Sequence, residues 1–498
     1  MLLSVPTEIL NKITFEADDQ TRGRLRSTCK LLSSVATPLL FQTVHINLTW
    51  KRRSSSLFLK SLTSGAKLAQ YIIHLSLYLP GRVRRRLSCL STESGTKKKE
   101  DRLDSLDAFL LEAIPLMVAL RHFSWRSSMD SGRKYTTQIF EQIRCLPLLS
   151  TLNVSTGFSS WDVSWSHFSH IRNFSYFGRG GTELATFLGH NPDIETIDAS
   201  VWRPRGLYLE GGKSISSLFS SLPLGTHSTV KRLRMIGNAY DQLYAHEIPT
   251  LIPHLRHLES LDIHMRPPDE FWDGLRDDEI YLASLSYSES TLERPLLSYL
   301  VSYTGLRELS LGILDQSTPE DVHVAGLLPS VIIMNSWCLT KIHIDPYYSG
   351  AWCLNHPMLD ALSCCNSLEI LRVCVDKTGT RVDANRNVID EILEALVVSW
   401  PNLWDLQIHV VSLSYGFEAL RTTASEVHKR ILAFRFTQLP PEQSALHISS
   451  DFATYSVKMH DRKRNIHAFK VWYLNYYGSK ESRRKYQFWK RSNDTNDG

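Results

Sequence analysis

The sequence predicts an α/β fold made of repeated units, each with one short strand and one helix. A six-residue phrase with apolar residues at positions 1, 4 and 6 occurs eleven times between residues 72 and 408. Its last three positions alternate apolar, polar and apolar, which is the period of a strand with one buried face. Segments with helical spacing separate the phrases, as in VIDEILEALVVSW from Val388. Because no such unit can bury its apolar face alone, we expect a solenoid with parallel strands on the concave face and helices on the convex face.

The eleven phrases share a spacing but no regular interval. They begin at Ile72, Leu120, Leu149, Ile171, Ile194, Val230, Leu258, Leu306, Leu339, Leu368 and Leu403, and successive starts lie 22 to 48 residues apart. The phrase resembles the LxxLxL strand of leucine-rich repeats over about residues 70–410. Most units lack the Asn or Cys that this family has after the strand, so we expect a distorted array without a continuous asparagine ladder. The alternative for each phrase is an ordinary strand of an α/β sheet.

The first 45 residues form a small helical unit ahead of the repeats. Pro6 suits the first turn of a helix, and Ile9, Leu10 and Ile13 are expected on one face of that helix. Asp18 or Asp19 is placed to cap the next helical segment. A second amphipathic stretch, with apolar or small residues at i, i+4, i+7 and i+11, is expected to end at Pro38; these residues are Leu25, Cys29, Leu32 and Ala36. Such a unit is too small to be stable on its own burial, so its apolar face needs a partner.

This unit resembles the F-box, a module that docks on the Skp-type adaptor of SCF ubiquitin ligases. The resemblance rests on VPTEILNKI from Val5 and LRSTCKLLSSVATPLLFQTV from Leu25. It implies adaptor-binding roles for Pro6, Glu8, Ile9, Ile13, Leu25, Cys29 and Leu32. Val5 stands where the family usually has Leu, and Gly23 lies within a predicted helix. The alternative is a pair of helices that cap the N-terminal edge of the solenoid.

An F-box ahead of leucine-rich repeats implies the substrate-recognition subunit of a cullin-type (SCF) ubiquitin ligase. The expected partners are the Skp-type adaptor with its cullin complex and a protein substrate that the sequence does not identify. We find no catalytic motif and no cofactor or metal motif, and we expect a non-catalytic chain. One alternative function is a leucine-rich-repeat scaffold that binds a protein without a ubiquitin link. Another is RNA binding through the basic C-terminal tail.

The polar residues inside the phrases are expected to face outward and to contact the substrate. The candidates are Asn153, Ser175, Asp198, Arg234, Asp262, Ser310, His343, Arg372 and Gln407. Their mixed charges suit a protein partner, because nucleic acid calls for a consistently basic surface. His264, His343 and His409 lie in units separated by 79 and 66 residues, so a shared metal site is not expected. Trp161 and Trp165 are expected either as interface anchors or as parts of a loop folded over the array.

The charges divide the chain into four predicted parts. The net charge of +5 combines two basic segments, Lys51–Lys99 and Lys458–Arg491, with an acidic remainder. The predicted parts are residues 1–45, the F-box-like helical module; 46–104, a basic linker or insert with the first repeat; 105–450, the irregular solenoid; and 451–498, a basic aromatic C-terminal cap and disordered tail. The basic clusters are interpreted either as import signals or as a solvated insert.

Two further expectations concern the C-terminal cap and the location of the chain. Phe469, Trp472, Tyr473 and Tyr476 have the spacing of one helix face, and we expect that helix to cap the last strand. No cationic region precedes an apolar run at the N-terminus, and the longest apolar stretch is interrupted by Glu112 and Pro115. A cytoplasmic or nuclear protein without a membrane partner is therefore predicted.

Overall fold

The structure is a computed structural model that divides the chain into two units, Met1–Leu282 and Ala283–Gly498. The predicted solenoid of residues 105–450 therefore contains a division between residues 282 and 283. The described residues are 5–48, 53–64, 67–79, 105–127, 135–156, 165–179, 184–202, 214–222, 225–236, 243–289, 292–313, 319–376, 387–411, 417–436, 447–450, 453–460 and 463–471.

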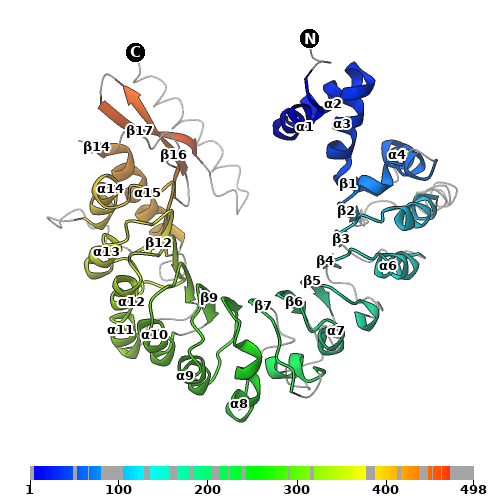
Figure 1. Cartoon of the computed structure of the whole chain (residues 1–498). Helices are drawn as coiled ribbons and strands as arrows, with labels where there is room; N and C mark the ends of the chain where they lie inside the picture. The colour runs from blue at the N-terminus through cyan, green and yellow to red at the C-terminus, as the bar shows by residue number, and fades with distance from the viewer. Residues whose placement is uncertain are drawn as a thin grey trace, which may run out of the picture. The chain divides into compact units, whose positions relative to one another are not determined.

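Among its described residues the first unit contains eight strands, each paired in parallel with the next (Figure 1). They are β1 (Thr43–Asn47), β2 (His74–Leu79), β3 (His122–Ser127), β4 (Thr151–Ser155), β5 (Asn173–Arg179), β6 (Thr196–Trp202), β7 (Arg232–Ile236) and β8 (Ser260–Ile263). The helices before and between them are α1 (Thr7–Glu16), α2 (Asp19–Thr28), α3 (Lys30–Phe41), α4 (Arg53–Thr63), a helix over 105–113, α6 (Thr136–Arg144), α7 (Leu184–His190), α8 (Ile248–Leu251) and α9 (Asp269–Asp277). Several repeats of this unit also contain a short 3-10 helix. These are η2 (Ala69–Tyr71), η3 (Ile114–Leu116), η4 (Trp165–His167), η5 (Ile215–Phe219), η6 (Ala245–Glu247) and η7 (Ile252–Leu255).

In the second unit, the residues that the structure describes form six parallel strands, followed by antiparallel ones. The parallel strands are β9 (Ser284–Glu289), β10 (Glu308–Ile313), β11 (Lys341–Pro346), β12 (Ile370–Val375), β13 (Asp405–Val410) and β15 (His447–Ser450). The antiparallel strands are β16 (Ala453–His460), β17 (Lys463–Val471) and the short β14 (Arg435–Phe436). The helices are α10 (Arg294–Val301), α11 (Pro319–Ala325), α12 (Leu328–Met334), α13 (His356–Leu362), α14 (Val388–Val398) and α15 (Phe417–Ala433).

All eleven phrases form the expected strands. In each phrase the strand begins at position 3, and the side chains at positions 1, 4 and 6 are buried, the most exposed of them at 4%. In LRHFSW, for example, Leu120, Phe123 and Trp125 are completely buried. Burying three such side chains in every unit supplies the main stabilising free energy, at roughly 1.5–3 kcal/mol for each large apolar side chain. The predicted α/β solenoid of leucine-rich-repeat type is confirmed for each unit, with strands on one side and helices on the other (Figure 1).

Neighbouring repeats are held in register by a recurrent backbone contact. The carbonyl at position 2 of one phrase accepts two N–H groups from positions 2 and 3 of the next. The Arg121 carbonyl, for example, accepts from Ser150 and Thr151, both at 2.9 Å, and the Arg307 carbonyl accepts from Thr340 and Lys341 at 2.9 and 3.1 Å. Because this contact recurs within the first unit and again within the second, equivalent positions of neighbouring strands lie side by side in each of them.

Two strands that the phrase count missed have the same spacing. The phrase that contains the start of β1 has Phe41, Val44 and Ile46 at positions 1, 4 and 6. The phrase that contains the start of β9 is LASLSY, from Leu282 to Tyr287. Leu282, Leu285 and Tyr287 are all at most 1% exposed, and Val44 and Ile46 are also buried. The signal for both strands was therefore present in the sequence.

Two buried asparagines, Asn191 and Asn335, bond to backbone groups between repeats. Asn191 accepts the Ile171 N–H at 2.8 Å and donates to the carbonyls of Phe168 and Phe187. In the second unit, Asn335 accepts the N–H groups of Gly305 and Leu306 at 2.9 and 3.0 Å. Each side chain satisfies backbone groups that are buried between two repeats, where an unpaired group would be costly.

Several local expectations are corrected. The N-terminal module has three helices, because the backbone becomes extended at Cys29 (φ −154°, ψ 165°) between α2 and α3. The second helical stretch does not end at Pro38, which lies inside α3. The boundary predicted at residue 45 falls inside β1.

The expected C-terminal helix is also corrected. Phe469 belongs to strand β17, which pairs with β16, so a helix face that includes it is excluded. Trp472, Tyr473 and Tyr476 lie outside the described residues.

Candidate functional site

The N-terminal module, here residues 5–41, has a core of its own. Leu10 and Thr14 of α1 are 1% exposed, and they face inward together with Val35 and Ala36 of α3. The Asp18 side chain accepts the Thr21 N–H at 2.6 Å, as expected for the cap of α2, and this bond lowers the pKa of the Asp18 carboxyl. The chief contacts of α1 and α2 are with α3, whereas α3 also contacts β1 and η2. Helix α3 therefore joins the module to the first repeats.

The module leaves apolar side chains exposed on α1. Ile9 is 49% and Ile13 is 52% exposed; Ile9 lies within one turn of the exposed Pro6 and Glu8, and Ile13 lies one turn beyond Ile9. Leu10 was expected on the same face as Ile9 and Ile13, but it points into the core instead. The exposed side chains of Ile9 and Ile13 form an apolar surface on one side of α1, because residues four apart share a helix face.

The other residues that the F-box resemblance implied are less accessible. Leu25 and Cys29 are half-buried, and Leu32 is only 6% exposed. Leu32 is thus a core residue of the module, and its predicted contact with an adaptor is corrected. Phe15 is 62% exposed on another side of α1 and was not singled out from the sequence.

The predicted outward residues of the repeats form two continuous rows. In the first unit, Asn153, Ser175, Asp198, Arg234 and Asp262 are register partners across β4 to β8. In the second unit, the register partners across β10 to β13 are Ser310, His343, Arg372 and Gln407. Neighbouring strands lie about 4.8 Å apart, so each row is a ridge of side chains that runs across the strands. We call these the first row and the second row.

The first row carries a chain of ion pairs. Arg234 Nε lies 2.8 Å from Asp262 Oδ2, and one of its terminal nitrogens lies 3.4 Å from Asp198 Oδ2. The Ser175 hydroxyl donates to Asp198 over 3.5 Å. His264 Nε2 lies 3.5 Å from Asp262 Oδ1. Two carboxylates share one guanidinium here, so Asp198, Arg234 and Asp262 together carry a charge of −1.

The second row is more tightly paired. Arg372 lies 2.6 Å from Asp345 Oδ2, and the Cys374 thiol donates to Asp345 Oδ1 at 3.2 Å. Burial lowers the pKa of His343 to about 4, and the nearby cations Lys341 and Arg372 act in the same direction. His343 is therefore neutral at physiological pH.

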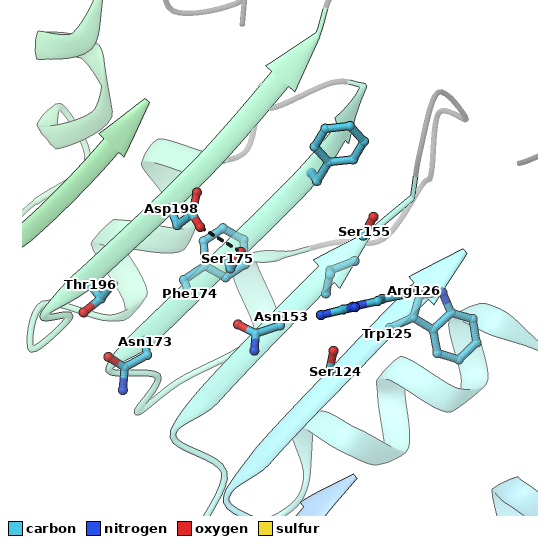
Figure 2. Close-up of a pocket in the computed structure, with 12 residues that line it drawn as sticks. Ser124, Trp125, Arg126, Asn153, Ser155, Asn173, Phe174, Ser175, Thr196 and Asp198 are labelled. Carbon is cyan, nitrogen blue, oxygen red and sulfur yellow. Dashed lines mark hydrogen bonds between the residues drawn. The ribbon is translucent and has the colours of Figure 1, made fainter. Parts of the chain in front are cut away.

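A groove lies on the strand side of β3 to β6 and has a volume of about 430 Å³ (Figure 2). Ser124 and Arg126 line it from β3, and Thr196 and Asp198 line it from β6. Asn153, Val154, Ser155, Asn173, Phe174, Ser175, Phe177 and Trp125 complete the lining. Three members of the first row thus lie in a concave site that the sequence did not reveal, because it depends on strands that are neighbours only in the folded chain.

Other candidate residues lie apart from these surfaces or outside the described ranges. Trp165 is 6% exposed and packs against Phe140, Phe168, Phe174 and Tyr176, so it is a core residue and not an interface anchor. The following lie outside the described residues: Trp161, the basic clusters around Arg84 and Lys97, and the basic tail beyond residue 471.

A metal site and a membrane span are both absent from the described residues. Within those ranges, no group of three or more His, Cys, Asp or Glu side chains is placed to hold a metal ion. No helix in the same ranges is long and apolar enough to cross a bilayer.

The sequence and structure of the chain were compared with those of known proteins. No family model matches the sequence, and no curated protein matches it. One similar solved structure is the yeast complex of Rad7 and Elc1, with 13% identity and a TM-score of 0.41 over 83% of this chain and 90% of that one. Another is human 5T4 (Wnt-activated inhibitory factor 1, trophoblast glycoprotein), with 14% identity and a TM-score of 0.24 over 45% of this chain and 72% of that one. The assignment of the fold rests on the strands and register of this chain.

Proposed function

We propose that the chain is the substrate-recognition subunit of a cullin-type (SCF) ubiquitin ligase. In this proposal the N-terminal module is an F-box that docks on a Skp-type adaptor, and the repeats hold a protein substrate. The transfer of ubiquitin is carried out by enzymes on other chains, so this chain supplies binding and no catalytic residue. The protein then works wherever the cullin complex is found, in the cytoplasm, the nucleus or both.

The exposure of Ile9 and Ile13 is the observation that carries the proposal. Both residues match the F-box pattern, and both keep about half of their surface in solvent although the module has buried Leu10 and Thr14. Complete burial of an exposed isoleucine side chain contributes roughly 1.5–3 kcal/mol, so burial of the half that is still exposed contributes about 1 kcal/mol for each residue. Burial of this pair against an adaptor therefore supplies the binding free energy that a unit of this size needs from a partner.

The rows of the repeats support a protein as the second partner. Arg234 lies between two carboxylates, and Arg372 is paired with Asp345. Such alternating charges are typical of protein interfaces, and they lack the uniform positive charge that phosphate groups select.

The test is co-purification of the full chain with a Skp-type adaptor. We expect the double variant Ile9→Asp, Ile13→Asp to bind the adaptor at least about 100-fold more weakly, because two buried apolar contacts are replaced by charges. The matched control is Leu57→Asp on α4, since Leu57 is 67% exposed and lies outside the module. Adaptor binding that survives the double variant, or that is lost equally in Leu57→Asp, contradicts the proposal.

The contacts of α3 favour a second candidate, a scaffold that binds a protein without a ubiquitin link. Because α3 contacts β1 and η2, the module has some features of a cap on the first repeats. Deletion of residues 1–28 removes α1 and α2 and leaves α3 in place. The receptor proposal expects a folded remainder with an unchanged melting temperature and no adaptor binding, whereas the scaffold expects a lower melting temperature.

A further inference from the structure

We propose that the groove across β3 to β6 binds an extended polypeptide segment that carries one acidic and one basic side chain four residues apart. The acidic side chain faces Arg126 and the basic side chain faces Asp198. This inference rests on the proposed function, since the segment belongs to the protein that the receptor recognises. The charge pair is the chemical feature by which the groove would recognise such a segment.

Arg126 supplies the site for the acidic side chain. It is exposed at the β3 side of the groove, and its guanidinium points into the groove in Figure 2. It makes no ion pair or hydrogen bond with any described residue. A guanidinium that no described residue pairs is suited to a carboxylate, which it can bind through two parallel hydrogen bonds.

Asp198 supplies the site for the basic side chain. Its contacts are long, at 3.4 Å to Arg234 and 3.5 Å to Ser175. Arg234 is closer to Asp262, at 2.8 Å, and the three side chains keep a charge of −1. A Lys or Arg side chain from a ligand would neutralise that charge by pairing with Asp198.

The distance between the two sites selects the spacing of the ligand. The three strand-to-strand steps from β3 to β6 cover about 14 Å, and Arg126 lies two residues beyond Ser124, the register partner of Asp198, which adds about 7 Å along the strand and brings the separation of the two Cα atoms to about 16 Å. An extended chain advances about 3.4 Å per residue, so residues i and i+4 span about 14 Å, and the long side chain of Arg126 covers the remaining distance. Side chains at even spacing also point to the same side of an extended chain, which allows both to enter the groove.

The middle of the groove suits the backbone of such a segment. Asn153 is half-buried, and its side-chain amide has no hydrogen bond to a described residue, so it can offer both a donor and an acceptor. Asn173 and Ser175 add polar groups, and Phe177, which is 38% exposed, adds an apolar contact. Asp198 and Asp262 would repel the phosphates of a nucleic acid.

The test is selection from a random octapeptide library displayed on phage, with the full chain as immobilised target and no adaptor present. We expect the selected peptides to be enriched in one acidic and one basic residue separated by three others. A synthetic peptide of the enriched sequence is then measured by fluorescence anisotropy. Arg126→Glu should weaken its binding about fivefold or more, and replacing the acidic residue of the peptide with Lys should restore binding to this variant. Asp198→Asn should remove the preference for the basic residue.

Matched controls lie in the same units but outside the lining. Arg121→Glu changes an exposed arginine that precedes β3, and Asp193→Asn changes an exposed aspartate that precedes β6. Both should leave peptide binding within twofold of the wild type. Circular dichroism and melting temperature confirm that each variant is folded.

Three results would overturn the inference. They are selection of no peptide, selection of peptides without the charge pair, and equal losses in Arg126→Glu and Arg121→Glu. Because the selection uses no adaptor, loss of the adaptor interaction would refute the ligase proposal and leave this result standing. Adaptor binding together with a negative selection would refute only the inference about the groove.

Discussion

The N-terminal module and the repeats differ in how far their apolar side chains are buried. In the repeats, every apolar position of the eleven phrases is buried, and the polar positions form the two rows. In α1, Leu10 is buried while its neighbour Ile9 and the following Ile13 stay half exposed. In the repeats, the apolar residues of the phrases stabilise the fold. In the N-terminal module, some apolar residues stay exposed and can contact a partner. Substitutions should therefore act mainly on stability in the repeats and mainly on binding at the exposed side of α1.

The largest expected effect is Asn335→Ala in the second unit. This completely buried side chain accepts the N–H groups of Gly305 and Leu306, and its loss leaves both donors unpaired. We expect a loss of about 4 kcal/mol in the free energy of unfolding, measured by urea denaturation. The amides of Gly305 and Leu306 should also lose protection in hydrogen exchange.

Asn402→Ala is the matched control for that substitution. Asn402 is exposed and makes one bond to the Asn366 carbonyl at 3.1 Å. Its replacement should change the free energy of unfolding by less than about 0.5 kcal/mol. Similar losses in the two variants would show that burial of the asparagine does not govern stability here.

The comparison within α1 is the second test. Leu10→Ala creates a cavity in the module and should cost about 3 kcal/mol, whereas Ile9→Ala should cost less than about 0.5 kcal/mol. Hydrogen exchange of the α1 and α3 amides reports the stability of the module directly. If Ile9→Ala destabilised the module as much as Leu10→Ala, Ile9 would be a core residue and the division between the two faces of α1 would be wrong.

A smaller effect is expected from pH at the second row. The pKa of His343 is lowered to about 4 in the folded chain, against about 6.5 in an unfolded chain. Between these values the unfolded chain binds more protons, so stability falls as the pH falls from about 6.5 to about 4. His343→Gln should reduce this loss, which a series of thermal melts at pH 7, 6, 5 and 4 would show. An unchanged pH dependence in the variant would contradict the burial of the imidazole.

The smallest effect is a gain in stability at Gly23. This residue lies inside α2, and a Cβ placed there has no atom within 4 Å. Gly23→Ala should stabilise the module by about 0.5–1 kcal/mol through helix propensity and should leave adaptor binding unchanged. The melting temperature and the adaptor affinity of the variant, measured together, test whether this departure from the F-box pattern affects binding.

Much of the fold could be predicted because its signals are local. The alternation within LRHFSW identifies the strand and the buried residues, and α14 buries Ile389, Ile392, Leu393 and Leu396 as their spacing indicates. The C-terminal strands could not be predicted in the same way. Phe469 has a helical spacing to later aromatics, but it lies in a strand that is stabilised by its pairing with β16.

The candidate sites were predictable only in part, because only some of their features depend on residues close together in the sequence. The nine outward residues were identified from the phrase, since the side of a strand follows from its period of two. Leu32 was assigned to an adaptor surface, and the structure places it in the core, because a motif names positions without stating which side of a short helix is covered.

For the eleven phrases, the sequence by itself determined the strand positions, the buried residues and the polar character of the opposite face, because these depend on residues a few positions apart. Only the tertiary structure decided that Ile9 and Ile13 remain exposed, since this depends on where α1 packs on α3. It also decided that Arg126 and Asp198 border one groove, because the register of four strands, and not the distance along the chain, brings these two charges together.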